Sequence, residues 1–308
     1  MENIEKTTHV KLEDCFITPI HKKSNIFNDN IAYVEQYDFS TANLNEQNRI
    51  AAVSCVASIC YANPKAAGSI NLYDRLACEA HSLPSSSFEF VPVLIPASQK
   101  SFEFIGPPDV APNIMKFGET IHHNGTPYIL TNYRAIIFDV ENKLISEAAL
   151  KFFNTPEECE IIKQHFKVFK FHVVMPTRSQ MVRHRVNWQE LSRRYVSGER
   201  IPFEFYISEK MKNITYTDRD NPEVPFSYSV DDVIEVCLGF YKAALDSGIK
   251  PQEARRIIPQ AAYTPIWGAF QPAQLANFLK LRDDKDHAQW EIMIVAQAMK
   301  ACIDIENS

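Results

Sequence analysis

The stretch FKFHVVMPTRSQMVRHRVNWQELSRRY, residues 169–195, combines the clearest fold signal of the chain with its densest charge. Its first six residues, FKFHVV, alternate between apolar and polar side chains, which is the period of a half-buried strand. Pro176 then opens a helix that we expect to run to about Arg185, because proline is favoured at the first helical position. The sequence therefore predicts a strand followed directly by a basic helix.

The segments after this stretch mix strands and helices without a regular alternation. The longest predicted helix begins at the cap Ser229, with Asp232 three residues on, and ends before Gly248. The other expected elements are strands at 204–208 and 263–270 and helices at 272–282 and 287–303. Such a mixture favours an α+β, or irregular α/β, fold.

The first half of the chain has weaker signals. Apolar residues recur at helical spacing over 45–60 and 70–81, and residues 85–95 have the composition of a strand. Further on, Asn124-Gly125 is typical of a hairpin turn, and Thr155 with Glu158 forms a capping box. Because residues 98–165 open with a proline-rich segment, we predict an inserted subdomain there and one domain built from 1–97 and 166–308.

Composition excludes several classes of protein. The 308 residues carry 32 basic and 38 acidic side chains, so no general attraction to a nucleic-acid polymer or an anionic membrane is expected. No apolar run approaches the roughly 18 residues that cross a bilayer. Seven scattered cysteines without a C-x-x-C pair indicate reduced thiols in a cytoplasmic protein. No G-x-G-x-x-G or Walker A loop is present, so side chains would have to bind any phosphate.

The basic residues are clustered despite the net charge of −6. Six of the thirteen arginines fall within 23 residues: Arg178, Arg183, Arg185, Arg193, Arg194 and Arg200. Guanidinium groups match phosphate and carboxylate oxygens, so this clustering is expected at an anion site. The alternative is a solvated face on which the arginines pair with Glu190 and Glu199. Gln180 and Ser192 favour the anion site because they are uncharged hydrogen-bonding groups.

Other kinds of site have little support. His287 and Glu291 are four residues apart, but no third ligand or H-E-x-x-H motif accompanies them, so no metal is expected. No cysteine has a histidine nearby in sequence, and no G-x-S-x-G motif exists, so nucleophilic hydrolysis has no local signal.

Three segments together resemble the flavin-dependent thymidylate synthases, often called ThyX: RHRVNWQELSRRY, SGIKPQEARRIIP and NFLKLRDDKDHAQWEI. The signature of that family is Arg-His-Arg, a short spacer, and Asn-Glu-x-Ser-x-Arg-Tyr. Arg183-His184-Arg185 and the residues 189–195 occupy this pattern, preceded by Gln180 where the family has a glutamine. The resemblance covers about residues 166–302 and more faintly 45–90.

The resemblance implies reductive methylation of dUMP at C5 to give dTMP. Methylenetetrahydrofolate would supply the carbon, and FAD, reduced by NADPH, would carry the hydride. It also implies a homotetramer whose sites form between subunits, and the family's fold of a central, mostly antiparallel sheet flanked by helices.

Site residues are implied by the same correspondence. Gln180, Ser192 and Arg194 would hold the phosphate, Glu190 the sugar, and Arg255 and Arg282 the uracil ring, with Arg183 also on the nucleotide side. Charge that develops on the ring carbonyls as C5 becomes nucleophilic could be stabilised by Arg282, the expected catalytic residue. The flavin would be lined by Ser54, Glu89, Arg183, His184, Arg185, Gln189, Gln271, Asn277 and His287.

The chain departs from the family pattern on the flavin side. The spacer between Arg185 and Ser192 is one residue shorter than usual, and Gln189 stands where asparagine is typical. Gln271 and Ala273 replace the common asparagine and flavin-contacting arginine. Two alternatives therefore stay open: a flavoenzyme that adds another one-carbon group, such as hydroxymethyl, to a pyrimidine nucleotide, and a catalytically silent nucleotide-binding scaffold.

Overall fold

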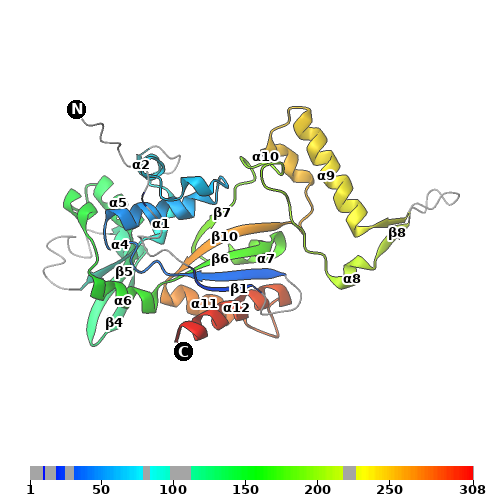
Figure 1. Ribbon diagram of the computed structural model, residues 1–308. Coiled ribbons are helices and arrows are strands. Elements are labelled where there is room, and N and C mark those ends of the chain that lie inside the picture. The colour runs from blue at the N-terminus through cyan, green and yellow to red at the C-terminus, as the bar shows by residue number, and fades with distance from the viewer. Residues whose placement is uncertain are drawn as a thin grey trace, which may run out of the picture.

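The computed structural model describes residues 10, 19–24, 31–78, 84–97, 112–217 and 227–307. Its centre is a five-stranded antiparallel sheet in the order β1-β2-β6-β10-β7 (Figure 1). The strands are β1 (Pro19–Ser24), β2 (Ala32–Tyr37), β6 (Lys167–Val174), β10 (Tyr263–Phe270) and β7 (Asn187–Glu190). The predicted α+β class with an antiparallel central sheet is confirmed.

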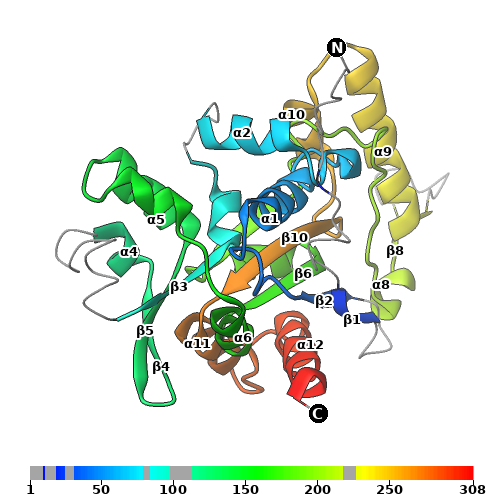
Figure 2. The ribbon, with the colours of Figure 1, turned by 60° about the vertical axis from the view of Figure 1, so that its left-hand side comes forward.

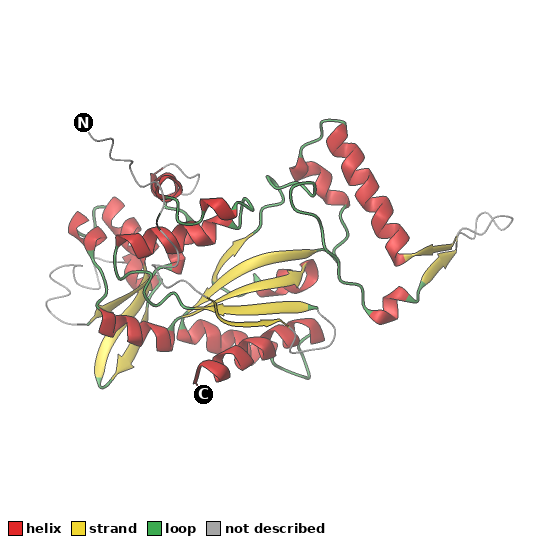
Figure 3. Cartoon of the chain, in the orientation of Figure 1, coloured by secondary structure: helices red, strands yellow, loops and turns green. Residues whose placement is uncertain are grey.

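Two C-terminal helices, α11 (Pro272–Arg282) and α12 (Trp290–Asn307), cover one face of this sheet (Figure 3). Phe169, Phe171 and Phe270 point from the strands into this layer and are fully buried. They pack with Val295 and Met299 of α12. The alternation of FKFHVV is thus the alternation between this core and the opposite face.

The first half of the chain covers part of the opposite face. It holds a second antiparallel sheet, β3-β5-β4, and several helices. Val168, Trp267 and Ala269 of the central sheet belong to the same apolar core as Leu94 and Leu130. The strands are β3 (Pro92–Pro96), β4 (Glu119–His123) and β5 (Thr126–Asn132), and the α-helices are α1 (Glu46–Ser58), α2 (Ile70–Cys78), α4 (Pro112–Lys116), α5 (Tyr133–Glu141) and α6 (Pro156–His165).

The division into a main domain and an insertion at 98–165 stays a prediction. Strand β3, which precedes residue 98, pairs with β5, which follows it. Residues 98–111, the proline-rich start of the predicted insertion, lie outside the described residues, as do 79–83 at the end of the helix expected at 70–81.

Local sequence signals are confirmed where they are strongest. Asn124 and Gly125 have φ of 49° and 78° in the β4–β5 turn, the positive values that the hairpin requires. Thr155 and Glu158 form the expected capping box. Residues 85–95 are only partly a strand, because Ser85 caps a short 3-10 helix, η3 (Ser86–Phe90), before β3 begins.

Residues 209–217 and 227–257 form an arm that extends from the body (Figures 1 and 2). It consists of α8 (Glu209–Lys212), β8 (Thr215–Thr217), β9 (Ser227–Ser229), α9 (Val230–Asp246), α10 (Pro251–Ala254) and the 3-10 turn η6 (Arg255–Ile257). The capping box of Ser229 and Asp232 is present, and Gly248 has a φ of +83° after the helix end, as predicted.

Two predictions around the central sheet are wrong. Residues 204–208 are not a strand: Phe205 only bridges Ala262, because β7 occupies the edge of β10 beyond that point. The helix that opens at Pro176 is α7 (Met175–Met181), which ends before Arg185. The chain then turns and forms β7, a strand that depends on pairing with β10 and that has no periodic signal of its own.

Candidate functional site

Strand β7 divides the arginine-rich stretch into two ends. Glu190 lies opposite Ile266 of β10, and Leu191 donates its backbone N–H to the carbonyl oxygen of Pro265 at 3.2 Å. The residues before the strand, 183–186, line one cavity, and those after it, 191–194, line another. The short spacer of the motif is therefore a strand of the central sheet, and it separates the two cavities.

The cavity after β7 has a volume of about 550 Å³ and contains one carboxylate, that of Glu190. We call it the five-arginine cavity after the guanidinium groups that line it. These belong to α7, to the turn after β7 and to the segment after α10: Arg178, Arg193, Arg194, Arg255 and Arg256. The structure thus brings the predicted nucleotide residues Glu190, Ser192, Arg194 and Arg255 together from separate parts of the chain.

Three of these arginines already have partners. Arg178 donates through Nε to Glu190 Oε2 at 2.8 Å and also through its terminal nitrogen, while Thr264 Oγ1 donates to Glu190 Oε1 at 3.2 Å. Arg193 donates to the carbonyl oxygen of Ile201 at 2.6 Å, and burial lowers the pKa of its guanidinium. Arg256 is 79% exposed at its side chain and lies 3.9 Å from a carboxylate oxygen of Glu253. The carboxylate of Glu190 is therefore fixed in place from two sides.

Arg194 and Arg255 differ from these three. In the described part of the chain, neither guanidinium has a hydrogen bond or a carboxylate within 4.0 Å, and the hydroxyl of Ser192 has no hydrogen-bond partner. The Arg194 guanidinium lies 5.2 Å from the ring centre of Tyr195. Two cations and a hydroxyl are thus available to an anion that enters the cavity.

The cavity before β7 has a volume of about 480 Å³, and no carboxylate lines it. We call it the three-arginine cavity. Its lining comes from the turn after α7 and from α11: Arg183, His184, Arg185, Val186, Ala273, Gln274, Asn277, Leu281 and Arg282. Four of the predicted flavin residues, Arg183, His184, Arg185 and Asn277, are therefore together, and so is Arg282.

A hydrogen bond organises this second cavity. Arg282 Nε donates to His184 Nε2 at 2.7 Å, and its terminal nitrogen donates to the backbone oxygen of Gln180 at 3.3 Å. His184 is buried and packs on the ring of Phe278 at 4.7 Å between centres. Burial, and then the charge of Arg282, lower the pKa of His184. The imidazole is therefore neutral and accepts the hydrogen bond.

Three predicted residues near the ends of α7, α11 and α12 do not line either cavity in one chain. The Gln180 amide donates to Gln289 Oε1 at 2.5 Å. Gln271 is buried and donates to the backbone oxygen of Phe117 at 2.8 Å. His287 is 83% exposed at its side chain and lies 3.0 Å from Asp284 Oδ2. Their roles in ligand binding stay predictions.

The remaining predicted flavin residues are engaged with the first half of the chain. Ser54 is fully buried, donates to the backbone oxygen of Ile50 and accepts from Gly68 N at 2.7 Å. Glu89 pairs with Arg134 at 2.5 Å. Gln189 accepts from Ser86 Oγ at 2.8 Å. These roles, too, stay predictions.

The pairing of an arginine with Glu190, expected as the alternative to an anion site, is found for Arg178, whereas the contact of Thr264 with Glu190 was not expected. Arg178 is a member of the arginine cluster, but its partner Glu190 is twelve residues away and is brought near by β7. Thr264 is 74 residues from Glu190 and meets it through the pairing of β10 with β7. No local pattern signals the contact of Thr264.

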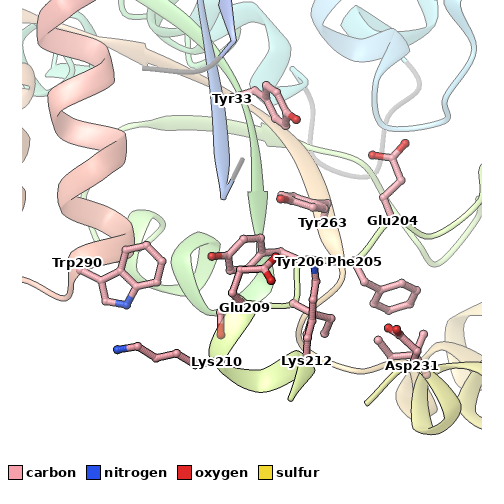
Figure 4. A pocket seen from close by; sticks show the side chains of 13 residues that line it. Tyr33, Glu204, Phe205, Tyr206, Glu209, Lys210, Lys212, Asp231, Tyr263 and Trp290 are labelled. Carbon is pink, nitrogen blue, oxygen red and sulfur yellow. Dashed lines mark hydrogen bonds and ion pairs between the residues drawn. The ribbon is translucent and has the colours of Figure 1, made fainter. Parts of the chain in front are cut away.

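A larger hollow, of about 1040 Å³, lies between the sheet and the arm (Figure 4). Tyr33, Tyr206, Tyr263 and Trp290 contribute aromatic rings to it, and no predicted site residue lines it. Tyr263 also lines the five-arginine cavity. Among the described residues there is no group of three or more histidine, cysteine or acidic side chains placed to hold a metal ion, and no helix has the length and apolar character needed to span a membrane.

The part of the chain that forms both cavities is similar to known proteins. Residues 162–304 match the family model described as thymidylate synthase complementing protein. The flavin-dependent thymidylate synthase of Thermosipho africanus is 34% identical over 137 residues, which are 41% of this chain and 58% of that protein. That of Thermotoga neapolitana is 35% identical over 135 residues, 43% and 59% of the two chains.

Residues 162–304 are thus similar to this family over slightly less than half of the chain. The chain spans about three fifths of the length of these relatives, and the resemblance read from the motifs is confirmed for its second half. Among solved structures, a UMP/dUMP methylase from Streptomyces cacaoi bound with 5-Br UMP is 25% identical and has a TM-score of 0.35. The aligned part is 45% of this chain and 67% of the methylase chain. The same methylase bound with 5-Br dUMP is 26% identical with the same TM-score.

Proposed function

We propose that the chain is a flavin-dependent methyltransferase that converts dUMP to dTMP, with methylenetetrahydrofolate and NADPH as co-substrates. One observation carries this proposal: the side chains of Ser192, Arg194 and Arg255, which have no hydrogen bond or ion pair among the described residues, surround a cavity together with a fixed carboxylate, Glu190. This is the set of groups that a nucleoside monophosphate requires, namely cations for the phosphate and an acceptor for a sugar hydroxyl. The family match of residues 162–304 supports the same assignment.

Each of these residues has a distinct part in binding. Arg194 and Ser192 bind the phosphate, and Arg255 faces the pyrimidine ring. Glu190 accepts a hydrogen bond from the sugar, and its bonds from Arg178 and Thr264 hold the carboxylate in one orientation. Ser192 is a ligand rather than a nucleophile, because no general base among the described residues contacts its hydroxyl.

The three-arginine cavity fits the anionic part of FAD. Arg183, Arg185 and Arg282 face it without a carboxylate, so a diphosphate would find guanidinium donors and no repulsion. Arg183, His184, Arg185 and Asn277 would hold the cofactor. When bound, FAD supplies the hydride that reduces the one-carbon unit on C5 of uracil.

Arg282 indicates that two copies of the chain build one site. This residue is the one expected to stabilise charge on the uracil carbonyls, yet it lines the three-arginine cavity and not the five-arginine cavity. A homotetramer, in which one subunit's five-arginine cavity meets another subunit's three-arginine cavity, resolves this. Helix α9 supports association because Val233, Val236 and Phe240 form an apolar stripe with exposed fractions of 47, 51 and 62%.

Release of tritium from C5-labelled dUMP tests the activity directly. The purified protein should show a flavin absorption band, release tritium with methylenetetrahydrofolate and NADPH, and give a product with the mass of dTMP. A bound flavin with a hydroxymethyl product would favour the alternative one-carbon transfer. If the protein takes up no FAD and releases no tritium, both enzymatic functions are refuted. The alternative of a catalytically silent nucleotide-binding scaffold then remains.

Subunit complementation tests the shared site. At a dUMP concentration below the wild-type Kd, Arg194→Ala and Arg282→Ala chains should each have little activity alone. They should regain part of the activity when they are co-expressed, because some sites then receive both wild-type halves. Absence of any regain in isolated mixed oligomers would place both residues in a site formed by one chain.

A further inference from the structure

The turn after α1 lies directly against the segment that follows β7. Ser192 donates its backbone N–H to the carbonyl oxygen of Cys60 at 3.0 Å, and Arg200 donates to the carbonyl oxygen of Ala62 at 3.2 Å. Between these two bonds, the rings of Tyr61 and Tyr195 are in contact, with their centres 5.5 Å apart. The turn lies outside residues 162–304, the part that matches the family model.

The contact continues to the anion-binding residue. The Arg194 guanidinium lies 5.2 Å from the ring centre of Tyr195, within the range of a cation–π interaction. Tyr61, Tyr195 and Arg194 thus form a ladder from the first half of the chain to the five-arginine cavity. The Tyr61 and Tyr195 residues are 44 and 50% exposed, so the ladder lies at the surface and makes little contribution to the core.

The base of the ladder is held in a fixed conformation. Ala62 has a φ of 47°, and Asn63 N closes the turn on the backbone oxygen of Ser58 at 3.0 Å. The Cys60 thiol accepts a hydrogen bond from Gln189, whose oxygen accepts another from Ser86 Oγ. Burial raises the pKa of Cys60 to about 11, so the thiol is neutral at pH 7. The turn is therefore attached both to β7 and to the residues after it.

We propose that Tyr61 is a positioning residue for the anion site, and that it acts through Tyr195 to hold the Arg194 guanidinium toward the bound phosphate. Without the ring of Tyr61, Tyr195 loses the surface on which it packs, and Arg194 samples orientations that do not reach the cavity. The first half of the chain thereby contributes to phosphate affinity without touching the ligand. This proposal rests on the proposed nucleotide pocket.

Binding of two probes that differ only in the phosphate tests the ladder. We expect Tyr61→Ala to raise the Kd for dUMP about fivefold, which corresponds to about 1 kcal/mol, and to leave the Kd for deoxyuridine unchanged. Tyr61→Phe keeps the ring and should bind dUMP like the wild type. Tyr216→Ala, which removes a 65% exposed tyrosine from the arm, is the matched control and should change neither Kd. Tyr61→Leu provides a second variant without a ring, and the melting temperature checks folding.

Other results would overturn the proposal. An unchanged Kd for dUMP in Tyr61→Ala would show that Tyr61 does not position Arg194. An equal loss of affinity for dUMP and deoxyuridine would show a general change in the pocket. If the wild type binds dUMP but has no turnover, the proposed reaction is refuted. The Kd values for dUMP and deoxyuridine then still decide the role of Tyr61. If the wild type binds inorganic phosphate but not dUMP, the Kd for phosphate gives the same decision. A wild type that binds neither overturns both proposals.

Discussion

The five-arginine cavity and the three-arginine cavity lie at the two ends of one short stretch, but they hold their arginines in different ways. In the first, Glu190 pairs with Arg178, Arg193 is bound to backbone oxygens, and the guanidinium groups of Arg194 and Arg255 have no hydrogen bond or ion pair among the described residues. In the second, no carboxylate is present, and Arg282 binds a neutral histidine. A ligand of the first cavity therefore meets a fixed carboxylate as well as cations, whereas a ligand of the second meets cations and a neutral imidazole.

Loss of Arg282 should have the largest effect. If this guanidinium stabilises charge on the uracil carbonyls, Arg282→Ala should lower kcat by about 100- to 1000-fold, the range for loss of one donor to a developing anion. The Kd for dUMP should change only modestly, because the phosphate is proposed to bind in the other cavity. Steady-state kinetics and calorimetry measure the two quantities. An unchanged kcat would remove Arg282 from the chemistry.

Loss of Arg194 should show the opposite pattern. A charge-assisted hydrogen bond is worth about 1.5–3 kcal/mol, so Arg194→Ala should weaken dUMP binding by about 10- to 150-fold. The loss should shrink as salt concentration rises, because the interaction is with a phosphate. Arg256→Ala is the control: Arg256 lines the same cavity but is 79% exposed at its side chain and lies beside Glu253. Equal losses in both variants would mean that the cavity attracts anions only by its total charge.

The contrast between the cavities was only partly predictable from sequence. The caps of α9 and α6 and the β4–β5 turn are set by side chains within a few residues of one another, so their patterns were sufficient. The family signature separated Arg183 to Arg185 from Glu190 to Arg194, and the two sets line different cavities. Arg183 was also expected on the nucleotide side, but within one chain it lines only the three-arginine cavity. The strand between them was missed, because β7 depends on the edge of β10, more than seventy residues away.

Side-chain direction was the other information that sequence did not contain. Gln180 precedes the motif at the family position, yet its amide is turned toward Gln289. Gln189 lies within the motif and binds Cys60 and Ser86 of the first half. All three partners are more than a hundred residues away in the sequence, so the contacts follow from the packing of whole elements and not from spacing.

The ion pair of the five-arginine cavity can be separated from ligand binding. Arg178→Met leaves the partly buried carboxylate of Glu190 without its cation and should lower the free energy of unfolding by about 1–3 kcal/mol. The double variant Arg178→Met, Glu190→Gln should recover part of this loss, because neither partner then carries a charge. Urea unfolding of the wild type, of Arg178→Met, of Glu190→Gln and of the double variant gives the coupling energy between the two residues. Additive losses would show that Arg178 and Glu190 do not interact in solution.

Acidification should affect the three-arginine cavity through its histidine. Burial lowers the pKa of His184 in the folded chain below its ordinary value near 6.5, so the unfolded chain takes up a proton first as pH falls. The stability contributed by the neutral ring is therefore complete above about pH 6.5 and is lost below it, by at most about 1.4 kcal/mol per pH unit. His184→Gln keeps an acceptor for Arg282 but has no proton to gain. Thermal unfolding between pH 7.5 and 5.5 should thus fall more steeply for the wild type than for this variant, and parallel curves would mean that His184 titrates alike in both states.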